Sequence, residues 1–219
     1  MKTGGLIGRA VVALAVTLMV RPLLAGAAEA ALPPGLIAIL QTPEHRRDLL
    51  IAAQAVSGAQ SQPCAAASYT TTGEVGMLTP YREDAAGKPI AGSWKESMTQ
   101  TGCGAPRLLN ALTTVQPDGK VVVGPLLPGT TIADPELQED SVQYAAAGLG
   151  TMPPGCERGG VIDTTFVGVV GQPPGVSPKP GDTRKPWTER WTLQACAKHA
   201  VVGMRFTPDA TGTGIEVRP

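Results

Sequence analysis

The sequence predicts an α+β fold, in which a small two-layer unit is duplicated in tandem and each copy is a helix followed by a four-stranded antiparallel sheet. The pattern Trp-x-Glu-x-x-Thr-x-x-x-Cys occurs twice, beginning at Trp94 and again at Trp187. The helix-start triplet Thr42-Pro43-Glu44 likewise returns as Asp134-Pro135-Glu136 at nearly the same offset. Because a fixed long period marks a repeat architecture, we expect the first repeat at residues 31–128 and the second at 129–219.

The composition agrees with small, turn-rich units. Glycine and proline are frequent, with 27 and 21 residues, and aromatic residues make up only 4% of the chain. Glycine and proline favour turns, and turns separate short strands. The chain has 219 residues, which is enough for one large domain or two small ones, each with a hydrophobic core.

Each repeat begins with a helix-start signal. A capping residue, Thr42 or Asp134, precedes a proline at the first helical position and a glutamate in the first turn. We expect the first helix to run from 43 to 56–58 and the second from 135 to about 147. An apolar stripe at helical spacing marks the first helix and consists of Leu49, Ala52, Ala53 and Val56.

Four strand-like segments follow the helix in each repeat. They are rich in Val, Thr, Trp and Ile, and turn residues bound them. In the first repeat they span 68–78, 93–101, 108–116 and 120–126, and in the second 161–170, 187–195, 200–207 and 214–218. The two sheets could lie side by side or join edge to edge into one eight-stranded sheet, which would remove two exposed edges.

The repeated tryptophans are predicted to anchor the cores. Alternate residues of a strand share a face, so that Trp187 and Glu189 point to the same side. A buried tryptophan removes a large apolar area from water, and we therefore expect Trp94 and Trp187 on the buried faces. Thr99 and Thr192 are the other structural positions of the repeated motif.

The first 30 residues have the pattern of a secretory signal peptide. Basic residues precede an apolar run at 10–20, and small residues allow cleavage after Ala27 or Ala30. The run ends short of the roughly 20 apolar residues that a membrane span needs. The composition is rich in Ala, Gly and Pro with a single Asn, which favours a bacterial source. We expect a periplasmic or secreted protein that is not inserted in the membrane after cleavage of the signal.

Four cysteines in an oxidising compartment indicate two disulfide bonds. Two pairings respect the duplication. Pairing within each repeat gives Cys64–Cys103 and Cys156–Cys196, with loops of nearly equal length, and is the pairing we favour. Crosswise pairing of equivalent cysteines is the alternative. Metal binding by the cysteines is disfavoured, because no Cys-x-x-Cys motif or histidine cluster accompanies them.

Few residues are candidates for a catalytic role, and a purely structural role is the alternative for each. Glu96 and Glu189 could be paired carboxylates across a cleft between the repeats. A structural requirement would also place a glutamate in both repeats, and this interpretation is favoured. His199 is a weak candidate for a general base, and His45 is expected on a solvated helix face. The chain contains neither the Gly-x-Ser-x-Gly motif of serine nucleophiles nor a phosphate-binding loop.

The leading hypothesis is an exported binding or envelope-associated protein without enzymatic activity. The expected partner is an unknown small molecule or envelope protein, and no cofactor or metal is expected. A net charge of zero gives no electrostatic support for nucleic-acid binding. The predicted interaction surfaces are the loops 79–92 and 171–186 and the groove between the repeats. The alternatives are a small periplasmic hydrolase using the two glutamates, and a protease-inhibitor-like protein with a disulfide-braced loop.

Overall fold

The computed structural model describes residues 32–58, 64–148, 154–156, 159–173, 175–179 and 181–218. All of them belong to one compact unit that begins at Leu32. The expected signal peptide and its two cleavage sites lie outside the described residues. The division into repeats at 31–128 and 129–219 stays a prediction, and we use it below to name the two halves of the chain.

The first repeat contains two helices and four strands. They are α1 (Pro34–Gln41), α2 (Pro43–Gly58), β1 (Ser68–Glu83), β2 (Pro89–Thr101), β3 (Arg107–Val115) and β4 (Val121–Leu126). The second repeat contains α3 (Pro135–Ala147), β5 (Gly159–Val169), the short 3₁₀ helix η1 (Asp182–Arg184), β6 (Trp187–Ala195), β7 (Lys198–Pro208) and β8 (Thr213–Arg218). Within these described ranges, no helix combines the length and apolarity needed to cross a membrane.

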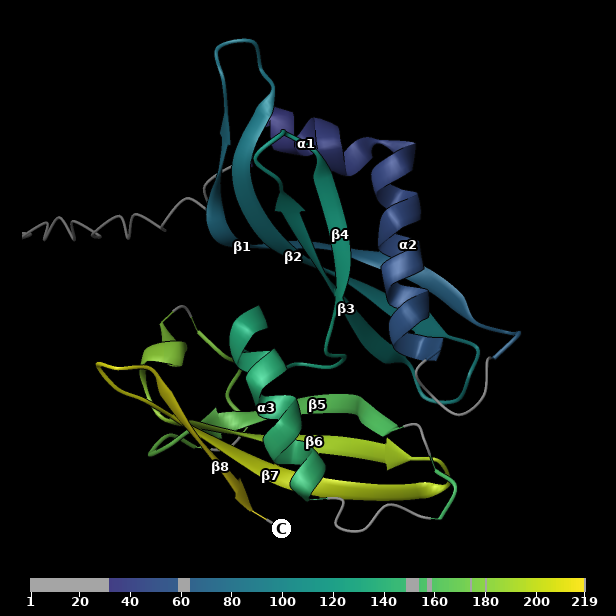
Figure 1. Ribbon diagram of the computed structural model, residues 1–219, viewed down its shortest axis with the longest axis vertical. Helices are drawn as coiled ribbons and strands as arrows, with labels where there is room; N and C mark the ends of the chain where they lie inside the picture. The colour runs from purple at the N-terminus through teal and green to yellow at the C-terminus, as the bar shows by residue number, and fades with distance from the viewer. Residues whose placement is uncertain are drawn as a thin grey trace, which may run out of the picture. The chain divides into compact units, whose positions relative to one another are not determined.

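The strands form two antiparallel sheets of four strands each, which confirms the α+β class (Figure 1). The hydrogen-bonded orders are β1-β2-β3-β4 and β5-β6-β7-β8, so that each sheet is a meander of consecutive strands. The strand pairings that the structure describes are all within one sheet or the other. The eight-stranded alternative stays a prediction.

Each sheet has a helix on one of its faces, and the apolar stripe of that helix builds the core (Figure 1). Helix α2 packs mainly on β3 and β4, whereas α3 packs on β8, β5 and β6. Leu49, Ala52 and Ala53 of α2 are buried against Met98 and Leu109. The predicted stripe of the first helix therefore faces the sheet, as a two-layer unit requires.

Helix α1 was not expected from the sequence, where its residues are a lead-in to the first helix. Proline occupies its first turn, and the backbone N–H of Thr42 closes it on Ile39 at 3.0 Å. Leu36 is fully buried in a cluster with Trp94 and Val115. An eight-residue helix is marginal by itself, so that α1 depends on this burial. The first repeat is consequently not the single-helix unit that the duplication suggested.

The segment 79–92 was expected to be a long loop, and this expectation is wrong. Strand β1 continues to Glu83 and β2 already begins at Pro89. The connection is a short turn in which the N–H of Asp84 donates to the carbonyl of Lys88 at 2.9 Å. The carboxylate of Asp84 also accepts the N–H of Ala86 and of Lys88. Aspartate and glycine at a turn, rather than the length of the polar stretch, decide the structure here.

The two disulfides, Cys64–Cys103 and Cys156–Cys196, each lie within one repeat. Their sequence separations are 39 and 40 residues. In both repeats one cysteine precedes the first strand of the sheet and the other follows the second strand. Each bridge therefore ties the open end of a hairpin. It does not brace the turn between the two strands, as an inhibitor-like loop would require.

Candidate functional site

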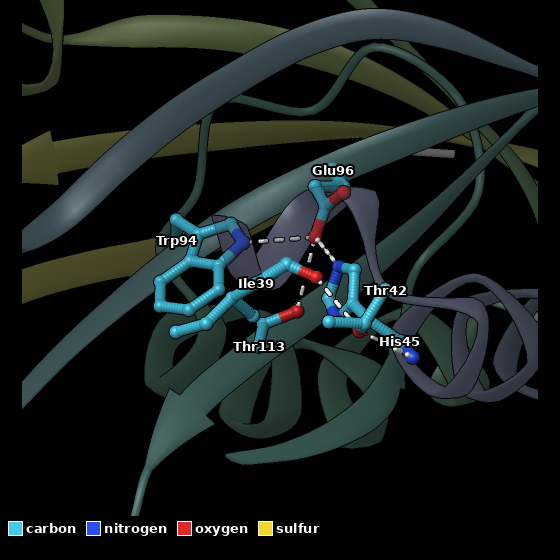
Figure 2. Close-up of polar contacts among 6 residues, drawn as sticks. All are labelled: Ile39, Thr42, His45, Trp94, Glu96 and Thr113. Atoms are coloured by element: carbon cyan, nitrogen blue, oxygen red, sulfur yellow. Dashed lines mark hydrogen bonds and ion pairs between the residues drawn. The ribbon is translucent and has the colours of Figure 1, made fainter. Parts of the chain in front are cut away.

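Glu96 lies at the centre of a buried polar cluster in the first repeat. Its Oε2 atom accepts hydrogen bonds from His45 Nε2 at 2.7 Å, from Trp94 Nε1 at 2.8 Å and from the Thr113 hydroxyl at 3.2 Å. Figure 2 shows these three donors converging on one carboxylate oxygen, while the other oxygen points away. A carboxylate is an acceptor only, and three donors from three elements fix its position.

The corner between α1 and α2 brings His45 to this cluster. The Thr42 hydroxyl donates to the carbonyl of Ile39 at 2.9 Å and accepts the N–H of His45 at 3.2 Å. Thr42 therefore ends α1 and caps α2 at the same time. His45 consequently lies in the first turn of α2, and its side chain points toward β2 and Glu96 (Figure 2).

The expectation that His45 lies on a solvated helix face is wrong. Its exposed fraction is 4%, and its side chain contacts Glu96 and Trp94. The sequence carried one signal of this burial. His45 is equivalent to Leu137 of the second repeat, so that a histidine occupies a position that is apolar in the other copy.

The second nitrogen of His45 restricts what this histidine can do. Nδ1 is buried and has no hydrogen-bond partner among the described residues. When Nε2–H donates its hydrogen bond to Glu96, Nδ1 of the neutral ring carries only a lone pair. A general base must reach the proton that it removes. Because Nδ1 is sealed from the surface, the free nitrogen of the His–Glu pair is not placed for that role.

The equivalent Glu189 in the second repeat accepts hydrogen bonds on both of its carboxylate oxygens. Its Oε1 accepts from Trp187 Nε1 at 2.9 Å and from the backbone N–H of Ile132 at 3.0 Å, and its Oε2 accepts from Trp191 Nε1 at 2.8 Å. Glu189 is 1% exposed and Trp191 is fully buried. Trp191 replaces Met98, so that an indole in the second repeat satisfies the oxygen that has no partner in the first.

A pocket of about 450 Å³ lies beside the Glu96 cluster. Its lining residues come from α1 and α2 and from the strands β1 and β2. Its lining residues include Glu96, which keeps 11% of its side chain exposed. Oε1 of Glu96 has no hydrogen-bond partner among the described residues, whereas Oε2 has three. Oε1 is therefore the oxygen that a bound molecule can reach.

The predicted catalytic candidates lie on three strands of the two sheets. Glu96 lies in β2 and Glu189 in β6, in different sheets, and each is held by donors of its own repeat. His199 is exposed near the start of β7 and pairs in register with Gln194, whereas Glu189 pairs with Met204. The paired-carboxylate arrangement of a hydrolase stays a prediction.

The structural positions of the repeated motif lie on the two faces of the strands. Trp94 and Trp187 are buried, with exposed fractions of 0% and 1%, and their indoles bond the glutamate of the same motif. Thr99 and Thr192 are half-buried on the opposite faces of β2 and β6. The motif thus builds one hydrogen-bonded core unit per repeat, in which the tryptophan and the glutamate are partners.

The segment 171–186 of the second repeat is held by Asp182, which is buried. Its Oδ2 accepts the backbone N–H of Lys179 at 2.7 Å, and its Oδ1 lies 3.3 Å from Lys185 Nζ. The backbone hydrogen bond from Lys179, followed by the side chain of Lys185, lowers the pKa of Asp182. The segment is therefore anchored at η1, and its role as an interaction surface stays a prediction, as does that of the groove between the repeats.

Among the described residues, no group of three or more His, Cys, Asp and Glu side chains is placed to hold a metal ion. No protein-family model, no curated protein and no solved structure matches the chain.

Proposed function

We propose that this chain is an exported binding protein without enzymatic activity, and that its first repeat binds a small molecule in the pocket beside Glu96. The second repeat is the closed, structural counterpart of the first. Signal-directed export, with a periplasmic or secreted location in a bacterium, is part of the proposal. Two disulfides support it, because such bonds persist in oxidising compartments.

The difference between the two copies of one core unit carries the proposal. In the second repeat three donors occupy both oxygens of Glu189. In the first repeat all three donors occupy one oxygen of Glu96, and the other faces a pocket of about 450 Å³. Small-molecule sites are concave and mainly apolar, with a few placed polar groups. The first repeat has these properties.

The absence of enzymatic activity is supported by how the polar groups near the pocket are engaged. The Nδ1 atom of His45 is buried, and the Ser97 hydroxyl donates to Asn110 at 2.7 Å. Catalysis by a histidine requires a nitrogen within reach of the substrate, and a serine nucleophile requires a base that accepts its proton. Neither condition is met by these two residues, and a binding role needs neither.

A swap between the repeats tests the binding function without knowledge of the ligand. Met98→Trp introduces the residue of the second repeat, so that an indole enters the pocket and approaches Glu96. The thermal stability of the wild type is measured with a panel of small cations, anions, zwitterions and neutral compounds. We expect at least one class to raise the melting temperature of the wild type but not that of Met98→Trp.

Thr99→Val is the matched control, because Thr99 lies on the same strand but on the opposite face from Met98. Its response to the panel should equal that of the wild type. Stabilisation that persists in Met98→Trp, or a panel in which no class stabilises the wild type, contradicts the proposed function. The indole N–H signal of Trp94, which lies on the same strand as both substitutions, shows whether each variant is folded.

A further inference from the structure

The geometry of the pocket points to the chemical class of its ligand: we propose that it binds an amphipathic primary amine, with the ammonium group on Glu96 Oε1 and an alkyl chain along the apolar wall. This inference rests on the proposed binding function. It specifies which end of a ligand lies at the floor of the pocket and which part lies along its sides.

The floor of the pocket requires a hydrogen-bond donor. Oε2 of Glu96 is held by three donors, so that the carboxylate cannot rotate to exchange its oxygens without breaking them. Oε1 remains an acceptor without a partner in the described part of the chain. A carboxylate accepts but does not donate, and its strongest partners are charged N–H groups. An ammonium group supplies such donors, whereas a carboxylate or a ketone would place an acceptor against an acceptor.

The fold has already removed Glu96 from water, which favours a charged ligand group. Its residue exposure is 8%, and Trp94 and Thr113 beside it are fully buried. Pairing two charges fails when the desolvation of both outweighs their attraction. Here the carboxylate is largely buried before the ligand arrives, so that binding desolvates mainly the ammonium group. The buried neighbours also lower the local dielectric and strengthen the attraction.

The walls of the pocket suit an alkyl chain. Five of the lining side chains are aliphatic or thioether groups from four elements, namely Leu40 of α1, Leu49 and Leu50 of α2, Val75 of β1 and Met98 of β2. Each methylene group that leaves water for such a wall stabilises binding by a similar increment. A ligand with a polar head and an apolar body therefore matches both parts of the site.

The charged residues at the rim of the pocket do not set its preference for a ligand charge, whereas Glu96 does. Arg46 and Glu74 also line the pocket, and both are exposed. They have opposite signs and are screened by solvent. Their effects on an approaching cation therefore oppose each other, and the buried carboxylate gives the pocket its net preference for positive charge.

Three probes of equal length test the proposal: n-hexylammonium, 1-hexanol and hexanoate. Binding is followed by NMR on the full mature chain, through the indole N–H signals. Trp94 donates to Glu96 and reports on the pocket, whereas Trp187 and Trp191 of the second repeat are internal controls. We expect the Trp94 signal to shift with hexylammonium at a concentration at least about tenfold lower than with hexanol, because a hydrogen bond to a charged group is the stronger one. Hexanoate should have no effect.

Glu96→Gln reverses the polarity of the pocket floor. The three donors hold the amide oxygen at the position of Oε2, so that the amide NH₂ occupies the position of Oε1. We expect this variant to lose the ammonium preference, with at least about a tenfold weaker response to hexylammonium. Glu44→Gln is the matched control, because it removes an exposed carboxylate of α2 that does not line the pocket. It should retain the order of the three probes.

The outcomes separate this inference from the proposed function. If hexanoate or hexanol shifts the Trp94 signal as readily as hexylammonium, or if Glu96→Gln retains the preference, the amine assignment is overturned while binding in the pocket stands. If no hexyl probe shifts the signal, the amine assignment is overturned, and the panel with Met98→Trp decides the binding function separately. If Glu96→Gln does not fold, the order of the probes on the wild type and on Glu44→Gln decides.

Discussion

Replacing Glu189 by glutamine should destabilise the protein more than the same change at Glu96, although the two residues occupy equivalent positions. A glutamine side chain has one acceptor oxygen and one NH₂ donor group. Glu189 accepts hydrogen bonds on both oxygens, two on Oε1 and one on Oε2. In Glu189→Gln, either orientation of the amide leaves at least one buried N–H facing the NH₂ group. In Glu96→Gln, the amide oxygen takes all three donors and the NH₂ group faces the pocket.

The size of the difference follows from these hydrogen bonds. Both variants lose the charge of the acceptor, so that this contribution largely cancels in the comparison. Glu189→Gln additionally leaves the indole N–H of Trp191 buried without a partner, which costs about 1–3 kcal/mol. We therefore expect Glu189→Gln to be less stable than Glu96→Gln by about 2 kcal/mol. For a chain of this size the difference corresponds to roughly 4–8 °C in melting temperature.

Urea unfolding of the oxidised variants, followed by tryptophan fluorescence, measures the two free energies. The slopes of the transitions must agree before the midpoints are compared. Equal stabilities, or a lower stability of Glu96→Gln, would refute the assignment of donors to the two carboxylates. The assignment of Glu96 Oε1 as an acceptor without a partner, on which the ligand proposal depends, would then be wrong as well.

Three further outcomes are expected. Replacing Cys156 and Cys196 by serine should lower the free energy of unfolding by about 4 kcal/mol, because the bridge closes a separation of 40 residues. Urea unfolding measures this loss. A loss below about 1 kcal/mol would contradict a stabilising role of the disulfide at the end of the hairpin. The pKa of Asp182 is lowered in the folded state, so that its contribution to stability is present above about pH 4 and is lost as the pH falls through the folded value. Unfolding of Asp182→Asn against pH should lack this part of the acid destabilisation, and identical profiles for variant and wild type would contradict it. Thr42→Ala should lower the free energy of unfolding by about 1 kcal/mol, because α2 loses its cap, and it should shift the NMR signals of His45. Unchanged His45 signals would show that the cap is not needed to position this histidine.

The parts of the fold that depend on local pattern could be predicted from the sequence. Strand β6 spans Trp187–Ala195 and helix α3 spans Pro135–Ala147, as expected from the alternation of side chains and from the capping signal at Asp134. The buried side of β6 contains Trp187 and Glu189 as predicted. These features follow from residues that are neighbours in the sequence, because the strand period and the helix cap are local.

The parts that depend on long-range contacts could not be predicted. His45 and Glu96 are 51 positions apart, and their hydrogen bond exists because the corner at Thr42 directs the start of α2 toward β2. No local pattern encodes that direction. The repeat pattern also failed to predict α1. The segment of the second copy that is equivalent to α1 contains Ile132, whose backbone N–H donates a hydrogen bond to Glu189. Where one copy uses a backbone donor, the other uses His45 of α2, the helix that follows the additional helix α1.

The disulfides have a consequence for the way in which the chain is oxidised. Cys64, Cys103, Cys156 and Cys196 are paired first with second and third with fourth along the chain. A catalyst that joins thiols in the order in which they emerge from a translocation channel would thus reach the native connectivity directly. Oxidative folding would then need an enzyme that oxidises thiols to disulfides, but no isomerase that exchanges non-native disulfides.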